Sequence, residues 1–148
     1  MAAVNSDQTN LHMIRTAFLA ALLLCPSLAT AQLSVAVSPV KTTGQKAIVP
    51  LAMRNGFAEA IESARAVCFL LDDQGKMVGQ VARWVIGGNR DRGPLPSGST
   101  NAFNIVITTD KPLRTTNLTA RLSFSRVVLE GGRLADVTRE VTVRAATK

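Results

Sequence analysis

The 148-residue sequence contains no tyrosine, one histidine, one tryptophan and two cysteines. His12 and Cys25 lie early in the chain, so residues 32–148 have no histidine and a single cysteine, Cys68. Histidine is the side chain most used for general acid–base catalysis and for binding transition metals near neutral pH. We therefore expect residues 32–148 to form neither an enzyme nor a metal or cofactor site.

A lone cysteine also excludes an internal disulfide in residues 32–148. Cys68 lies in the apolar run 66–71. In such surroundings a free cysteine behaves as a small hydrophobic residue, so we predict a buried, unreactive thiol. A reactive thiol, or one that links two molecules, is the alternative.

Long hydrophobic runs are missing as well. The apolar stretch 16–24 is shorter than the roughly 20 residues that a membrane-spanning helix needs. It follows a basic start at Arg15 and precedes Ala29-Thr30-Ala31, which offers small residues at the two positions that a signal peptidase reads. We predict a signal peptide over 1–31, cleavage after Ala31, and a periplasmic or secreted protein.

Two features of this segment leave alternatives. Met13 is an alternative start, because residues 1–12 are polar and add nothing to the signal. Cys25 suggests a lipoprotein, but leucines precede it where a lipidated cysteine normally follows a small residue. We expect one domain over 32–148, of ordinary size and without a transmembrane segment.

The charge is predominantly positive, with 17 Lys and Arg against 10 Asp and Glu and a formal net charge of +7. This balance favours anionic surroundings, such as phospholipid headgroups, lipopolysaccharide or acidic polymers. The arginines are scattered and form no basic run. We therefore do not expect a nucleic-acid partner, and ordinary solvated surface is the alternative explanation of the charge.

Short β-rich runs separated by turn residues fill the chain beyond Ala31. They predict seven strands, over 33–37, 46–54, 64–71, 76–86, 101–107, 118–125 and 135–144. No long helical period interrupts them. This pattern predicts an all-β fold, an immunoglobulin-like seven-stranded antiparallel β-sandwich after an N-terminal signal peptide.

Local signals add detail to the strands. Pro50 argues for a sheet edge or a bulge, because proline cannot donate a ladder hydrogen bond. Residues 57–62 are expected to be a linker with some helical character. Residues 72–75 (Asp-Asp-Gln-Gly) fit a turn better than a calcium loop, and 130–133 predict a hairpin turn before the last strand.

The segment 87–98 is rich in glycine, proline and charge, and predicts a loop. Trp84, on the strand before it, is expected to share the core face with Val78, Ala82 and Ile86. A surface on which a sugar or lipid headgroup stacks is the alternative for Trp84.

Three arginines belong to this loop or lead into it. Arg90 and Arg92 lie in the loop, and Arg83 should face solvent if Trp84 faces inward. These three residues are our candidate ligand-binding site.

Residues 66–107 resemble the FxLYD-type domains of bacterial exported proteins, an immunoglobulin-like family. The resemblance rests on Cys68-Phe69-Leu70-Leu71-Asp72, on Gly75-Lys76-Met77-Val78-Gly79, and on Pro94-Leu95-Pro96-Ser97-Gly98-Ser99 followed by Phe103. Cys68 stands where the family has phenylalanine, and Leu71 where it has tyrosine. The resemblance implies a fold and an extracytoplasmic setting, and it implies no catalytic residue.

The sequence therefore favours a non-catalytic exported module that binds another envelope or extracellular protein through a strand edge. The alternative is a module that binds an anionic glycan or lipid headgroup through loop 87–98. An accessory module of either kind is expected to need no cofactor.

Overall fold

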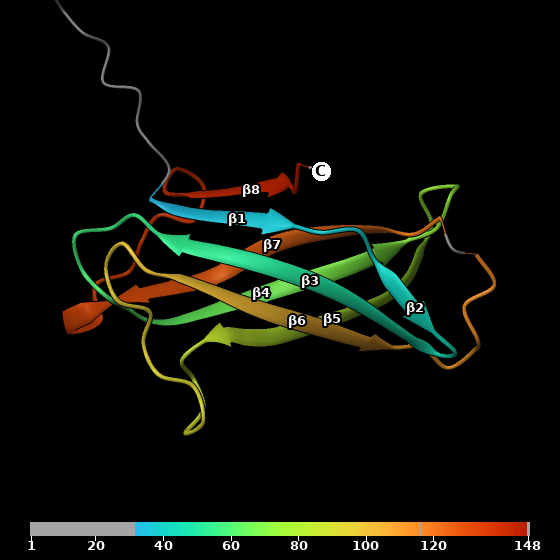
Figure 1. Cartoon of the computed structure of the whole chain (residues 1–148), viewed down its shortest axis with the longest axis horizontal. Coiled ribbons are helices and arrows are strands. Elements are labelled where there is room, and N and C mark those ends of the chain that lie inside the picture. The colour runs from blue at the N-terminus through green and yellow to red at the C-terminus, as the bar shows by residue number, and fades with distance from the viewer. Residues whose placement is uncertain (1–31, 116, 148) are drawn as a thin grey trace, which may run out of the picture.

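Two β-sheets face each other across one apolar core (Figure 1). The computed structural model describes residues 32–115 and 117–147. The predicted signal peptide, with its cleavage site at Ala31, lies outside the described residues, as do the alternative start at Met13 and Cys25.

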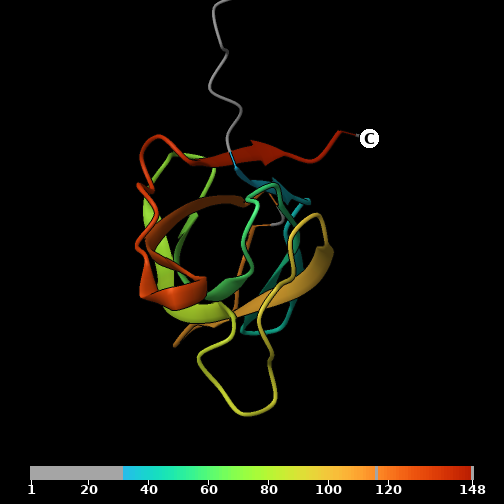
Figure 2. The same cartoon turned by 90° about the vertical axis from the view of Figure 1, so that its left-hand side faces the viewer.

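Eight strands make up the sheets: β1 (Leu33–Val37), β2 (Lys41–Thr43), β3 (Lys46–Asn55), β4 (Ile61–Leu71), β5 (Met77–Ile86), β6 (Thr100–Thr108), β7 (Thr119–Leu129) and β8 (Val141–Ala145). A 3₁₀ turn, η1 (Glu130–Gly132), follows β7. One sheet contains β6, β3, β1, β8 and the short β2, and the other has the order β5-β4-β7. The described residues contain no α-helix, so the all-β prediction is confirmed, and seen end-on the two sheets enclose the core (Figure 2).

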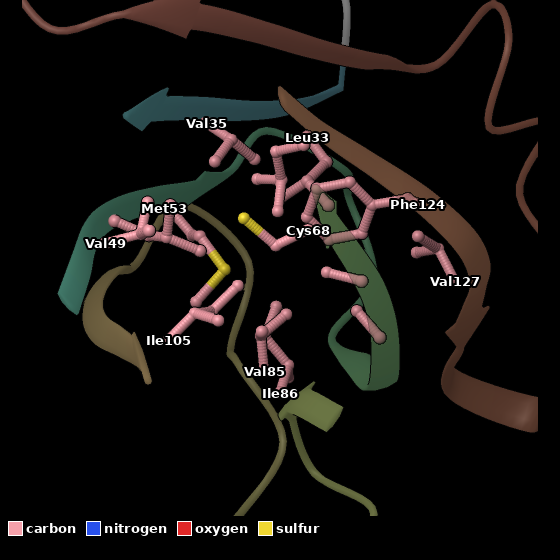
Figure 3. Close-up of a cluster of buried hydrophobic side chains, with 14 of the residues drawn as sticks. Leu33, Val35, Val49, Met53, Cys68, Val85, Ile86, Ile105, Phe124 and Val127 are labelled. Atoms are coloured by element: carbon pink, nitrogen blue, oxygen red, sulfur yellow. The ribbon is translucent and has the colours of Figure 1, made fainter. Parts of the chain in front are cut away.

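Alternating apolar residues of both sheets build the core. On β3, Val49, Leu51 and Met53 are buried, as their spacing in the sequence predicts. Figure 3 shows Met53, Cys68 and Ile105 pointing into the same interior from three strands. Burying such side chains away from water is the main favourable term that holds the two sheets together.

Pro50 lies in the middle of its sheet, so the prediction of an edge is wrong. β3 pairs with β6 on one side, and with β1 and β2 in succession on the other. The Pro50 carbonyl accepts a hydrogen bond from the Ser38 N–H, 2.9 Å away. Ser38 belongs to the link between β1 and β2, so the proline occupies the point where β3 changes partner and costs no ladder bond.

The end of the chain also differs from the prediction. Residues 130–133 do make a tight turn, but the strand after it pairs only at the bridge between Val128 and Leu134. Residues 136–140 then form a second turn, in which the Asp136 carboxylate accepts the Thr138 N–H at 2.9 Å. This turn carries β8 to the other sheet, where it pairs parallel to β1, so the predicted strand over 135–144 and the purely antiparallel sheet are wrong.

The structure differs from the predicted strands at two further places, the start of β4 and the short strand β2. β4 begins at Ile61, which is buried, so the linker expected over 57–62 ends earlier and has no helix. β2 was not predicted, because its sequence, Lys-Thr-Thr, has no apolar alternation. It is a strand because a tight turn at Gly44 returns the chain to pair with the start of β3.

Candidate functional site

Asn55 anchors loop 87–98 to the sandwich. Its side chain is fully buried, and its Nδ2 donates to the carbonyls of Glu59 and Leu95, each 2.9 Å away. Its Oδ1 accepts the Phe57 N–H at 2.9 Å. Both N–H groups and the oxygen of the amide are therefore engaged within the protein, which makes Asn55 a structural residue.

Arg92 folds back from the loop onto the body of the protein. Its guanidinium donates to the Trp84 carbonyl and lies 4.7 Å from the centre of the Phe103 ring. Phe103 faces inward from β6, opposite Leu51, so Arg92 covers the margin of the core. A guanidinium held this way is a structural clip between the loop, β5 and β6.

Arg83 and Arg90 are the exposed members of the candidate site. The loop that carries Arg90 extends from the body (Figures 1 and 2). Gly87 (φ +54°) starts this loop with a close approach: a Cβ there would lie 2.0 Å from the Glu62 carbonyl oxygen. The structure thus separates Arg92 from the other two, and binding of a ligand by these arginines stays a prediction.

Trp84 does not share the core face with Ile86, so its expected inward orientation is wrong. Trp84 pairs with Arg65 and Ile86 with Ala64, which leaves Val85 as an extra residue in β5. Val85 and Ile86 are both buried, and this bulge reverses the faces of the residues before it. Trp84 therefore lies on the outer face of the β5-β4-β7 sheet.

The same bulge places Arg83 on the inner side of β5, opposite the buried Ala66. Arg83 remains exposed because β5 is the edge strand of its sheet. The Trp84 ring is closely contacted: a Cβ on Gly88 would lie 2.5 Å from its Cγ, and the Arg65 guanidinium lies 6.0 Å from its centre. These neighbours crowd the indole, so it is not an open platform for stacking a sugar.

Cys68 is fully buried among core side chains (Figure 3), which confirms the predicted burial. Burial raises the pKa of its thiol to about 11. The neutral thiol is therefore the form present near neutral pH.

The free edge of β6 has the features of a strand-pairing site. β6 pairs with β3 over nine residues without a register shift, and its sequence, Thr-Asn-Ala-Phe-Asn-Ile-Val-Ile-Thr, has no charge and no proline. Natural edge strands are usually blunted by charge, proline, bulges or short length. β5 and β7 carry bulges in their pairing with β4, and β8 has five residues.

The pairing also shows which backbone groups of β6 are free. The Pro50 carbonyl points to Ser38, away from β6, so Pro50 and Asn104 form a pair that exchanges no hydrogen bonds. The N–H and C=O of Asn104 therefore point away from β3. By alternation, the same holds for Thr100, Ala102, Val106 and Thr108, whose side chains are all exposed.

In residues 32–115 and 117–147, no three His, Cys, Asp or Glu side chains gather closely enough to bind a metal ion. The same part of the chain has no helix with the length and apolar character of a membrane span.

The chain defines an all-β sandwich, and comparison with known proteins adds a structural likeness. No protein-family model and no curated protein matches the chain. It is similar to a crystal structure described as the ApaA protein of Bordetella pertussis, with 17% identity, a TM-score of 0.51, and coverage of 70% of this chain and 84% of that one. At that identity the likeness shows the fold alone.

Two other solved structures are more distant. The structural-genomics target SoR45 has 12% identity and a TM-score of 0.42, with coverage of 70% of this chain and 75% of that one. A β-glucuronidase from glycoside hydrolase family 2 has 13% identity and a TM-score of 0.36, over 68% of this chain and 13% of that one. Neither informs on the function of this chain.

Proposed function

We propose that the protein is an exported, non-catalytic module that binds another envelope or extracellular protein by adding one of that protein's extended segments to the free edge of β6. The observation that carries this proposal is the nine-residue, uncharged, unbulged edge of β6. An added strand would use the outward N–H and C=O groups of Asn104 and its alternate neighbours. The exposed side chains at the same positions would give the pairing its specificity.

The export step of the proposal rests on the signal-like sequence of residues 1–31. The non-catalytic role is supported by the composition of residues 32–148, which have no histidine. The proposal includes the resemblance to FxLYD-type immunoglobulin-like domains. The residues that carry this resemblance lie mainly on β4, β5, loop 87–98 and β6.

The test uses a photo-crosslinking amino acid placed at position 102 of the exported protein in its host, with position 54, on the outer face of β3, as the control site. The protein that crosslinks at position 102 is then purified, and its Kd is measured for the parent and for Asn104→Pro and Asn104→Ala. Asn104→Pro removes an outward N–H and no bond to β3, whereas Asn104→Ala changes the side chain alone.

We expect Asn104→Pro to raise the Kd at least tenfold and Asn104→Ala to raise it less than threefold. Circular dichroism verifies that Asn104→Pro is folded, and Val106→Lys, which places a charge at the same edge, replaces it if it is not. Equal binding by the folded edge variant and by Asn104→Ala would refute strand addition at β6.

A further inference from the structure

The outer face of the β5-β4-β7 sheet has an apolar centre. β4 is buried on its inner side at Ala66 and Cys68, and its outward side chains, Val67, Phe69 and Leu71, are also apolar and partly exposed. A strand that is apolar on both faces is typical of a sheet covered on both sides. The described chain has only two layers, so nothing within it covers this face.

Three arginines flank this apolar centre, at one end of it and along its β7 side. Arg65 stands opposite Trp84 on one side and opposite Arg126 on the other, and Phe69 stands opposite Arg121. Partners in register point to the same side of a sheet, so these side chains share the outer face. We call the surface made by Val67, Phe69, Leu71, Trp84, Arg65, Arg121 and Arg126 the arginine-rimmed face.

The arginines of this face have no acidic partner there. In the described part of the chain the ion pairs are Arg133–Glu59 and Arg139–Asp136, at 2.9 and 3.7 Å, both elsewhere. Two of the acidic residues at the ends of β4, Glu62 and Asp72, are engaged locally. Glu62 accepts the Gly131 N–H, and Asp72 accepts two N–H groups of its turn. The face therefore carries uncompensated positive charge beside an apolar centre.

The apolar centre and the positive charge of this face suit some binding partners and exclude others. A second copy placed face to face would bring two sets of three arginines together, and such like-charge contact is strongly unfavourable. A glycan would bury hydroxyl groups against Val67, Phe69 and Leu71, which offer no side-chain hydrogen bonds. An acidic polypeptide segment with apolar side chains can pack on the apolar centre and also pair its carboxylates with the arginines.

We propose that the arginine-rimmed face binds an acidic segment of a partner protein, with apolar side chains of the segment on Val67, Phe69 and Leu71 and its carboxylates on the arginines. Planar guanidinium groups suit carboxylates because they donate two parallel hydrogen bonds. This face and the β6 edge belong to different sheets, so the inference does not depend on strand addition at β6.

Trp84 is the single tryptophan of the chain and lies on this face, so its fluorescence reports occupancy directly. A random-peptide phage library is selected on the purified protein, and the enriched peptides are synthesised and titrated against Trp84 emission. Polygalacturonate and vesicles containing phosphatidylglycerol are titrated in parallel, as an acidic glycan and an anionic membrane.

The decisive variant is Arg65→Glu/Arg121→Glu/Arg126→Glu. Its matched control, Arg54→Glu/Arg114→Glu/Arg144→Glu, makes the same change in net charge at exposed arginines elsewhere. If the first variant is not folded by circular dichroism, the corresponding triple change to glutamine replaces it, with its own matched control.

We expect the enriched peptides to carry carboxylates beside apolar residues and to shift Trp84 emission. Their Kd should rise at least tenfold in the decisive variant and less than threefold in the control, and it should rise with salt. Enrichment of peptides without acidic residues, or an equal loss in both variants, would overturn the proposal. So would arginine-dependent binding of polygalacturonate or vesicles without any binding of peptides.

Discussion

Replacing Asn55 should destabilise the protein more than any replacement of an exposed residue on the same strand. Its amide makes three hydrogen bonds in a fully buried position, to Phe57, Glu59 and Leu95. At about 1 kcal/mol net for each bond, Asn55→Ala should lower the free energy of unfolding by roughly 3 kcal/mol, and the buried groups left without partners add to this loss. That is a large fraction of the 5–15 kcal/mol typical of a domain.

Asn55→Asp makes the expectation more specific. An aspartate keeps the acceptor for the Phe57 N–H, but when ionised it places charge against the carbonyl oxygens of Glu59 and Leu95. Burial and these dipoles should raise its folded-state pKa above the unfolded value of about 3.9. The variant should therefore lose no stability by ionisation below about pH 4, and progressively more as the pH rises towards its folded-state pKa.

The assay is urea unfolding followed by Trp84 fluorescence, for the parent, Asn55→Ala and Asn55→Asp, between pH 4 and 7. Asparagine does not titrate, so the difference between the parent and Asn55→Asp isolates the introduced carboxyl group. The interpretation fails if Asn55→Ala costs less than about 1 kcal/mol, below the net value of even one typical buried bond. It also fails if the difference between parent and Asn55→Asp does not grow with pH.

Three other predictions concern single residues. The buried Cys68 thiol, with its pKa raised to about 11, should resist iodoacetamide at pH 8 in the native protein and react only after unfolding. The thiol of the unfolded chain ionises at a lower pH than the buried thiol, so the free energy of unfolding should also fall as the pH rises above about 9. Arg92→Ala should lower the free energy of unfolding by about 1–2 kcal/mol through lost contacts to β5 and β6, whereas Arg90→Ala should change it by less than about 0.5 kcal/mol in the same urea titration. Gly88→Ala should lower the melting temperature further than Gly75→Ala, because both glycines have positive φ but only Gly88 lies against Trp84.

Periodicity in the sequence was enough to place the long strands. The alternation at Val49, Leu51 and Met53 identifies the buried face of β3. The turn predicted over residues 72–75 is confirmed, because it depends on a local interaction in which the Asp72 carboxylate accepts the N–H groups of Gln74 and Lys76. Features that depend on contacts between distant residues were missed. Asn55 followed by Gly56 looks like the end of a strand, and only the fold brings Leu95 to its side chain.

In the candidate site too, local sequence predicts the loop, whereas contacts between distant residues decide what each arginine does. Arg90 and Arg92 are two residues apart in a loop, and nothing local distinguishes them. The fold brings Trp84 and Phe103 to Arg92, which becomes a structural clip while Arg90 stays exposed. The sequence could therefore place a basic loop at one end of the sandwich, but not the number of arginines available to a ligand.

The extra residue in β5 has the largest effect on the surface that we propose binds a partner. A strict alternation that ends on the apolar Ile86 puts Trp84 in the core and leaves the outer face of the β5-β4-β7 sheet unremarkable. With Val85 bulged, Val85 and Ile86 both fill the core, and Trp84 joins Arg65 and Phe69 outside. One inserted residue thus turns an expected core tryptophan into part of an exposed surface, and it explains why the apolar outer side of β4 lies beside an aromatic ring and a guanidinium.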